Sequence, residues 1–179
     1  GESTEDYKPM LAEDWEISED GKTYSFKIRD NVYFHSGEKL TPEDVEYSLE
    51  RVMVMDTPKG AAKLLLEPLV GVKSTKSGEN FVVDYEDIDS SVEVENNWVH
   101  LNLAGTYPPI MDIIAHPVCS IVEKDWAVQH GAWPGTENTW ENYNKPEEPP
   151  LHEVMSGTGP FEFERWDKGS LVELSRNEN

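Results

Sequence analysis

The chain has 179 residues, and its hydrophobic fraction of 37% with six tryptophans indicates a buried core rather than intrinsic disorder. It carries 36 acidic and 15 basic residues, so its formal net charge is −21. A field of that sign repels phosphates and argues against nucleic acid or an anionic membrane as a partner. Most of this charge is interpreted as a solvated surface, with attraction of cations as the alternative.

The first third of the chain has the most regular pattern. Asp20-Gly21 predicts a tight turn into a strand that alternates apolar and polar side chains. Thr41 and Pro42 are the residue types favoured at an N-cap and at the first helical position, so they predict a helix that continues to about Met53. The strands predicted before this helix are a short one within 10–19, one at 22–29 and one at 32–35.

The rest of the chain alternates between short helices and short strands. Helices are predicted at 61–70, from Pro108-Pro109 onward and at 122–131. Strands are predicted around 81–85, at 91–95, at 98–103 and in a final hairpin within 157–177.

Strands joined by hairpin-type connections and interspersed with helices predict an α+β fold, an antiparallel sheet with flanking helices. We interpret residues 1–179 as a single domain and residues 132–153 as a long surface loop within it. Trp133 and Trp140 in this loop either pin it to the domain or form a stacking surface for a sugar or a peptide side chain. Pinning is the favoured interpretation, because aromatic side chains commonly hold long loops in place.

No group of residues indicates catalysis or predicts a metal or cofactor. The glycine-rich residues 156–160 lack the Lys-Ser/Thr of a phosphate loop and predict a tight turn. Cys119, the only cysteine, lies three residues after His116, but a catalytic base normally reaches its thiol across the fold. His35 is interpreted as structural. The histidines occur singly, without the spacing of metal ligands, at positions 35, 100, 116, 130 and 152.

The ends of the chain and its hydropathy limit what can be said about its location. No apolar run approaches the ~20 residues needed to span a bilayer, and no signal peptide is recognisable. The chain begins at Gly1 and ends at Asn179 without a visibly finished element. We therefore expect it to be a mature or excised piece of a longer protein.

One long motif links most of these elements. It reads Leu11-Ala12-Glu13-x-Trp15, then Asp20-Gly21-Lys22-x-Tyr24-x-Phe26-x-Ile28-Arg29-x2-Val32-x-Phe34-His35-x-Gly37, then Leu40-Thr41-x-Glu43-Asp44-Val45-x-Tyr47-Ser48-Leu49-x-Arg51. Further matching segments are residues 116–126, Gly157-Thr158-Gly159-Pro160-Phe161 and Arg176-Asn177. In this order the motif closely resembles family 5 extracellular solute-binding proteins, the dipeptide-, oligopeptide- and nickel-type receptors of ABC importers.

The resemblance implies a substrate-binding component that captures oligopeptides outside the membrane and delivers them to an ABC permease. An oligosaccharide receptor of the same family is the alternative. Such proteins are two-lobed clamshells, so this chain is expected to be part of the first lobe and to fold without binding ligand tightly in the absence of the second. Its expected location is extracytoplasmic, either periplasmic or lipid-anchored at the outer face of the cell membrane.

The resemblance also implies ligand contacts at Lys59, His116 and Pro117. Lys59 lies in Thr57-Pro58-Lys59-Gly60, which departs from the commoner Ser-Pro-Tyr form of a ligand-facing loop, so no stacking contact is expected there. A surface lysine and a packed histidine are the alternative interpretations. Two other functional classes stay open: a hydrolase that uses a carboxylate pair, and a purely structural or interaction domain.

Overall fold

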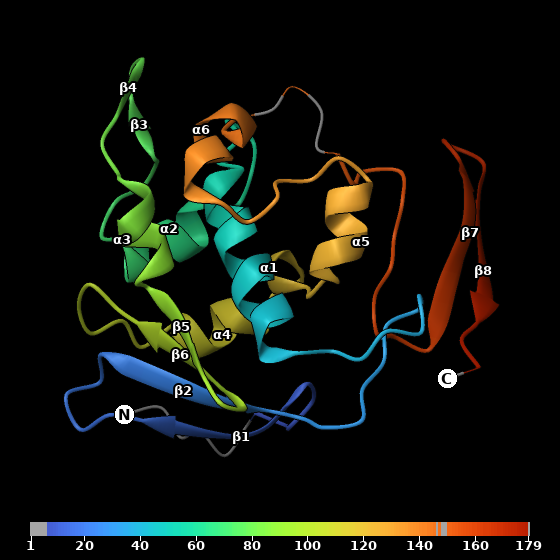
Figure 1. Ribbon diagram of the computed structural model, residues 1–179, viewed down its shortest axis with the longest axis horizontal. Helices are drawn as coiled ribbons and strands as arrows, with labels where there is room; N and C mark the ends of the chain where they lie inside the picture. Colours follow the sequence, from blue (N-terminus) through green and yellow to red (C-terminus); the bar gives the residue numbers. More distant parts are fainter. Residues whose placement is uncertain (1–6, 146, 148–149, 179) are drawn as a thin grey trace.

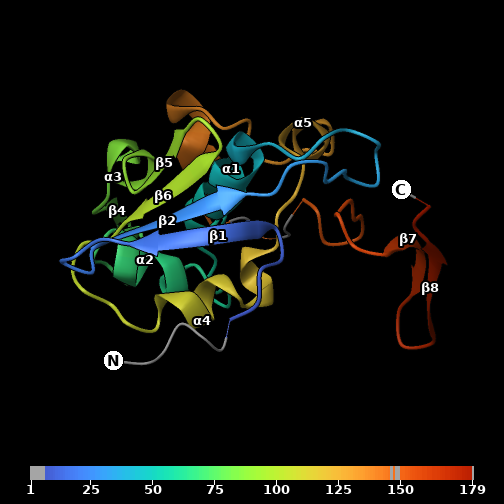
Figure 2. The ribbon, with the colours of Figure 1, turned by 90° about the horizontal axis from the view of Figure 1, so that it is seen from below.

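The computed structural model describes residues 7–145, 147 and 150–178. Its main sheet has four antiparallel strands in the order β1-β2-β6-β5. Helices cover one face of this sheet, with α1 crossing it (Figures 1 and 2). The strands are β1 (Ala12–Ile17), β2 (Thr23–Ile28), β5 (Val92–Glu95) and β6 (Trp98–Asn102).

Short elements make up the rest of the molecule. The α-helices are α1 (Pro42–Val54), α2 (Lys63–Leu69), α3 (Tyr85–Asp89), α4 (Ile110–Ile114), α5 (Lys124–Gln129) and α6 (Trp140–Tyr143). The 3-10 helices are Pro117–Cys119 and Glu137–Thr139. The remaining strands form two separate hairpins: β3 (Lys76–Ser77) with β4 (Asn80–Phe81), and β7 (Phe161–Asp167) with β8 (Leu171–Arg176).

The predicted α+β class is confirmed. In β2 the side chains of Tyr24, Phe26 and Ile28 are buried, whereas the residues between them are partly exposed. This is the expected pattern for a strand with one face against a core. The predicted β5–β6 hairpin is confirmed as well, because Asn96 at its turn has a φ of 56°, a conformation that asparagine tolerates better than most residues.

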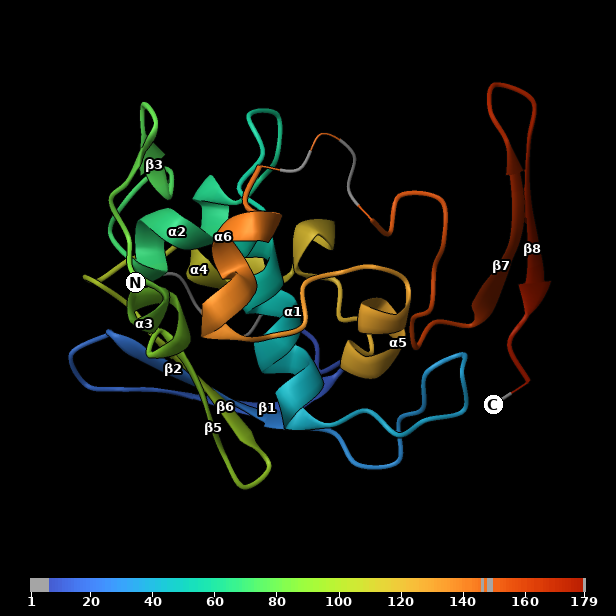
Figure 3. The same cartoon turned by 45° about the horizontal axis from the view of Figure 1, so that its top comes forward.

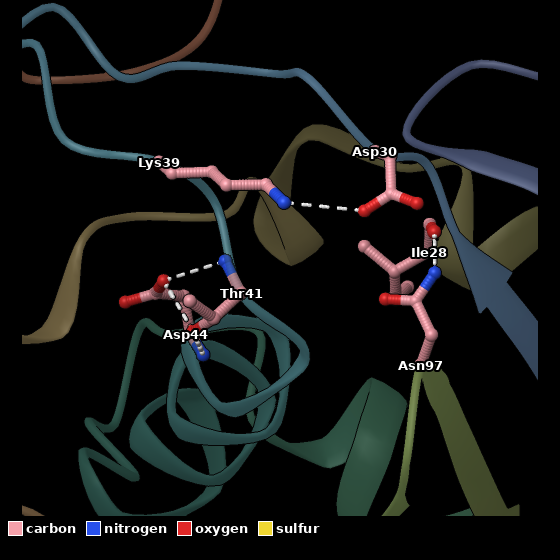
Figure 4. Close-up of polar contacts among 6 residues, drawn as sticks. All are labelled: Ile28, Asp30, Lys39, Thr41, Asp44 and Asn97. Atoms are coloured by element: carbon pink, nitrogen blue, oxygen red, sulfur yellow. Dashed lines mark hydrogen bonds and ion pairs between the residues drawn. The ribbon is translucent and has the colours of Figure 1, made fainter.

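Helix α1 begins as its sequence predicts. The Thr41 backbone N–H donates to Asp44 Oδ2 at 2.9 Å, and the Asp44 N–H donates to Thr41 Oγ1 at 3.3 Å, which together form a capping box (Figure 4). Val45, Leu49 and Met53 lie on its buried face.

Further polar contacts hold the loop that precedes α1 and the β5–β6 turn (Figure 4). Lys39 Nζ pairs with Asp30 Oδ1 at 3.2 Å. The Ile28 N–H donates to the Asn97 backbone oxygen at 2.9 Å, and the Asn97 side-chain amide donates back to the Ile28 carbonyl. The β5–β6 turn is therefore bonded to the end of β2, which fixes where the chain leaves the sheet.

Two strand predictions were wrong. Residues 32–35 form no strand: Tyr33 makes an isolated bridge with Lys39, while Phe34 is fully buried in a loop. Of the strand predicted at 81–85, only Asn80–Phe81 is extended. The next residues turn into α3, because Asp84 caps that helix in a capping box with Asp87.

The final hairpin is confirmed, but its position could not be read from the pattern. Its turn is closed by a hydrogen bond from the Ser170 N–H to the Asp167 carbonyl at 2.9 Å. Strands β7 and β8 pair with each other and with no other strand in the described part of the chain. The hairpin stands apart from the helical layer (Figures 1 and 3). It exposes Phe161, Trp166, Leu171, Val172 and Leu174.

The segment 132–153 is more structured than predicted, since it contains a 3-10 helix and α6; residues 146, 148 and 149 lie outside the described residues. Trp133 is fully buried, its ring stacked on Tyr47 and in edge contact with Tyr85. Trp140 is also buried. The pinning interpretation is confirmed, because neither indole is available to a ligand.

Candidate ligand-binding site

A cavity of about 350 Å³ separates the helical layer from the β7–β8 hairpin. Both Figure 1 and Figure 3 show α5 on the side of the helical layer that faces the hairpin. The volume of the cavity lies at the lower end of the range of small-molecule pockets. Its walls are largely apolar, with contributions from Val118, Val122, Trp126, Leu151, Phe163 and Trp166.

Arg51, near the end of α1, brings a cation to this cavity. Its Nε atom is buried and has no hydrogen-bond partner, and its Nη1 atom donates to Met55 Sδ at 3.2 Å. No carboxylate among the described residues pairs with it. Burial lowers the pKa of Arg51, but an arginine stays protonated in proteins. Among the residues that the structure describes, the positive charge of Arg51 therefore has no ion-pair partner.

Ser156 is a second polar residue of the wall without a partner. Its side chain is 5% exposed, and its Oγ atom makes no hydrogen bond. Buried hydroxyl groups are normally hydrogen-bonded. Arg51 and Ser156 thus give one cavity two unsatisfied polar groups.

Glu153, also in the wall, does not neutralise Arg51. Its Oε1 atom pairs with Lys168 Nζ at 2.5 Å and with His152 Nε2 at 3.3 Å. The hydrogen bond from Lys168 is the main reason why the pKa of Glu153 is lowered. This ion pair links the segment before β7 to the β7–β8 turn.

The segment that carries Ser156 is held by His35. The Gly157 N–H donates to His35 Nδ1 at 3.2 Å, and His35 Nε2 lies 2.9 Å from the Gly159 carbonyl oxygen, to which it donates. The His35 backbone N–H also donates to the Gly157 carbonyl at 2.8 Å. The structural interpretation of His35 is confirmed: it positions the turn that leads into the hairpin.

The structure does not bring the predicted contact residues together at this cavity. Pro117 is exposed and lines it. His116 is exposed next to it, but its Nδ1 accepts from the Val118 N–H at 3.1 Å and it does not line the cavity. Lys59 is exposed in the loop after α1 and does not line it either.

Sequence reasoning missed Arg51 and Ser156 as site residues. Arg51 was visible only as the last residue of a motif, and Ser156 only as the first residue of a turn. An arginine in an amphipathic helix normally extends into solvent. That Arg51 has no ion-pair partner among the described residues depends on the tertiary arrangement of α1 and the β7–β8 hairpin.

Two buried groups elsewhere are not arranged for catalysis. Burial raises the pKa of the Cys119 thiol to about 12, and its Sγ donates to the Ile113 carbonyl. A thiol held protonated in this way is a poor nucleophile. Burial, followed by the charges of Glu46 and Asp89, raises the pKa of Glu50 to about 8.

Across the described residues, no three or more His, Cys, Asp or Glu side chains gather as metal ligands would.

Comparison with known proteins identifies the fold family. Residues 6–179 match the family model described as bacterial extracellular solute-binding proteins, family 5 Middle. The chain belongs to this family. Among curated family 5 relatives, it is 28% identical over 164 residues to the dipeptide-binding protein of Escherichia coli K12, covering 92% of this chain and 28% of that protein. It is 27% identical to heme-binding protein A of Haemophilus influenzae, covering 97% of this chain and 29% of that one.

Solved structures of binding proteins have the same fold. NikZ from Campylobacter jejuni, in complex with Ni(L-His), superposes with a TM-score of 0.64 at 26% identity, covering 96% of this chain and 27% of that one. DppA from Helicobacter pylori, in complex with the peptide STSA, superposes with a TM-score of 0.63 at 25% identity, covering 96% and 30%. The chain thus spans less than a third of its family 5 relatives and corresponds to part of a lobe of a periplasmic binding protein.

The comparisons also bear on two functional expectations. The family model that this chain matches describes extracellular solute-binding proteins, and the curated relatives are named as binding proteins. Within the part of the chain that the structure describes, no helix has the length and apolar character needed to cross a bilayer.

Proposed function

We propose that this chain is part of the substrate-binding component of an ABC importer that captures oligopeptides outside the membrane and delivers them to a permease. The supporting observation is the family 5 match along residues 6–179. Relatives named for dipeptides, and the di/tripeptide-binding proteins of Pseudomonas aeruginosa, are 22–29% identical to it. Its location would then be periplasmic or lipid-anchored at the outer face of the cell membrane.

Oligosaccharide is the second candidate ligand within the family, but it has lost its main support. That alternative rested on Trp133 and Trp140 as a stacking surface for a sugar. Trp133 is fully buried and Trp140 is 5% exposed. Oligopeptide is the better supported ligand class, because several of the curated relatives are named for di- and tripeptides.

The proposal places ligand contacts at Lys59, His116 and Pro117, and it includes a second lobe that closes over the ligand. Lys59 and His116 have exposed side chains, as contacts to a ligand held between two lobes require. A hydrolase would need an activated nucleophile or a metal centre. Neither Cys119 nor Glu50 has the environment of one.

A thermal-shift screen of the full-length protein tests this function. A ligand that binds only the folded state adds about 2.7 kcal/mol of stability at a hundred times its Kd, which is a measurable rise in Tm. We expect di- to pentapeptides to raise the Tm, whereas neutral oligosaccharides do not. A rise with oligosaccharides and none with peptides would contradict the proposal.

A further inference from the structure

We propose that His35 forms a pH-sensitive clasp: its neutral ring holds the β7–β8 hairpin beside the helical layer, and protonation of the ring releases the hairpin. The clasp consists of the ring contacts of His35 with Gly157 and Gly159 in the turn before β7. The hairpin supplies Phe163 and Trp166 to the cavity wall, so its release changes the width of the cavity. The inference goes beyond the proposed function and is independent of it, because it concerns a conformational change within this chain.

The two nitrogen atoms of the His35 ring have opposite hydrogen-bonding roles. A backbone N–H can only donate, so Nδ1, which lies 3.2 Å from the Gly157 nitrogen, must accept and carry no proton. A carbonyl oxygen can only accept, so Nε2, which lies 2.9 Å from the Gly159 oxygen, must carry the proton. Together the two contacts require the neutral imidazole in a single tautomer.

Protonation of the ring is incompatible with this arrangement. In the imidazolium ion both nitrogen atoms are donors, so Nδ1–H would face the Gly157 N–H, which is also a donor. Rotation of the His35 ring would relieve that contact but would break the bond from Nε2–H to the Gly159 carbonyl. Histidine is the side chain that ordinarily changes its charge between about pH 5 and 8. A modest acidification is therefore enough to break the clasp.

The turn at 156–160 joins the hairpin to the rest of the molecule. Within the described part of the chain, β7 and β8 pair only with each other, and the hairpin stands apart from the helical layer (Figures 1 and 3). Besides the clasp, the His35 backbone N–H donates to the Gly157 carbonyl at 2.8 Å. Asn177 Nδ2 donates to the Gly159 carbonyl at 3.0 Å, but Asn177 follows β8 and moves with the hairpin. Once the ring is protonated, His35 holds the turn through its backbone alone.

The nearby ion pairs act differently from the clasp. His100 and His152 each lie close to a carboxylate, whereas His35 forms no ion pair within the described residues. Protonation of His152 would strengthen its pairing with Glu153, which also binds Lys168 in the hairpin turn at 2.5 Å. The titration of His152 therefore opposes release of the hairpin.

The other charged groups near the clasp do not explain a release on acidification either. Carboxylates, lysines and arginines do not ordinarily titrate between about pH 5.5 and 7.5. Burial raises the pKa of Glu50 to about 8, so acidification stabilises the fold through Glu50. The charged side chains on the segments that meet near His35 are Glu38 and Lys39 in its own loop, Glu123 before α5, and Arg176 and Glu178 at the end of β8.

NMR spectroscopy of the 179-residue chain tests the clasp directly. At about pH 7.5, the ring ¹⁵N signals of His35 should show Nδ1 without a proton and Nε2 with one. Between about pH 7.5 and 5.5, we expect protection of the Gly157 amide from hydrogen exchange to fall at least ~3-fold, because the amide loses its acceptor. Protection is corrected for the intrinsic pH dependence of exchange. The opposite tautomer at about pH 7.5, or equal protection at both pH values, would overturn the inference.

Pulsed electron paramagnetic resonance measures the release of the hairpin itself. Spin labels are attached at Asp125→Cys on α5 and at Ser170→Cys in the hairpin turn, two exposed positions. The native Cys119 is buried and remains unlabelled. We expect a narrow distribution of distances between the labels at about pH 7.5 and a broader one at about pH 5.5, where His35 is charged. A distribution of the same width at both pH values would refute the release.

Variants assign the pH dependence to His35. His35→Gln does not titrate and lacks the acceptor, so it should show the broad distribution at both pH values. The matched control is His130→Gln at an exposed histidine whose Nδ1 donates to the Trp126 carbonyl at 2.8 Å, a bond that protonation does not break. It should behave like the wild type, and so should His152→Gln. A wild-type pH response in His35→Gln, or its loss in either other variant, would overturn the assignment. If His35→Gln does not fold, the ring tautomer and the pH response of the wild-type chain still decide the matter.

Discussion

The Asp44 carboxylate accepts a hydrogen bond from the Lys124 backbone N–H at 2.9 Å, although the two residues are eighty positions apart. Its other oxygen accepts from the Thr41 N–H of the α1 cap at 2.9 Å. One buried carboxylate thus satisfies free N–H groups at the starts of two helices, α1 and α5. Both starts lie in elements that border the cavity, since α1 carries Arg51 and α5 carries Trp126.

Replacing Asp44 by alanine should therefore cost more than the loss of an ordinary cap. A helix cap contributes about 0.5–2 kcal/mol, and a hydrogen bond to a charged group contributes about 1.5–3 kcal/mol. We expect Asp44→Ala to lower the free energy of unfolding by about 2–4 kcal/mol in urea denaturation. Glu43→Ala, at an exposed acidic residue of the same turn, is the matched control and should cost less than about 1 kcal/mol.

Glu50 should make the stability of the chain depend on pH. Its pKa is raised to about 8 by burial and by Glu46 and Asp89, whereas Tyr85 and Lys124 act in the opposite direction. The folded chain keeps this proton to a higher pH than the unfolded chain, so the contribution of Glu50 is full below about pH 4.5. It is lost as the pH rises towards about 8 and changes little above that.

Glu50→Gln tests this dependence, because glutamine resembles the protonated acid and does not titrate. The variant should gain stability over the wild type as the pH rises from about 5 to about 9, by a few kcal/mol in all. Urea denaturation at several pH values measures the difference. Glu79→Gln, at an exposed residue, should follow the wild-type profile; a Glu50→Gln profile parallel to the wild type would refute the expectation.

His35 should control the order of the turn before β7. His35→Ala removes the acceptor for the Gly157 N–H and the donor to the Gly159 carbonyl. We expect hydrogen exchange of the amides at 156–159 to become at least ~10-fold faster, because local opening is no longer opposed by these bonds. Glu38→Ala, at an exposed residue of the same loop, is the control. Unchanged exchange in His35→Ala would show that the turn is held by other contacts.

Trp133 should behave as a core residue although it lies in a polar segment. Trp133→Ala should destabilise the chain by about 3–5 kcal/mol, the usual cost of truncating a buried aromatic side chain. Its ring is fully buried against Tyr47 and Tyr85, and its Nε1–H donates to the Thr136 carbonyl at 3.1 Å. Trp166→Ala is the matched control, since Trp166 is 45% exposed, and thermal unfolding should show a loss of less than about 1 kcal/mol. Similar losses for both tryptophans would contradict the assigned role of Trp133.

Local chemistry made several elements predictable. Thr41 and Asp44 begin α1, Asn96 turns the β5–β6 hairpin, and alternation marks β2, because each signal depends on neighbours in sequence. The two wrong strand predictions have different causes. Residues 32–35 alternate like a strand but have no partner strand, and Asp84 starts a helix where the apolar pattern suggested extension.

The sequence alone determined the α+β class, the start of α1 and, through the motif from Leu11 to Arg51, the family. The tertiary structure decided which polar groups lack partners. Arg51 and Ser156 are about a hundred positions apart, and each is unremarkable in its own segment. Both line the same cavity, and His35 holds the turn next to Ser156. Whether a buried charge is neutralised depends on contacts between distant segments, and composition and local pattern do not carry that information.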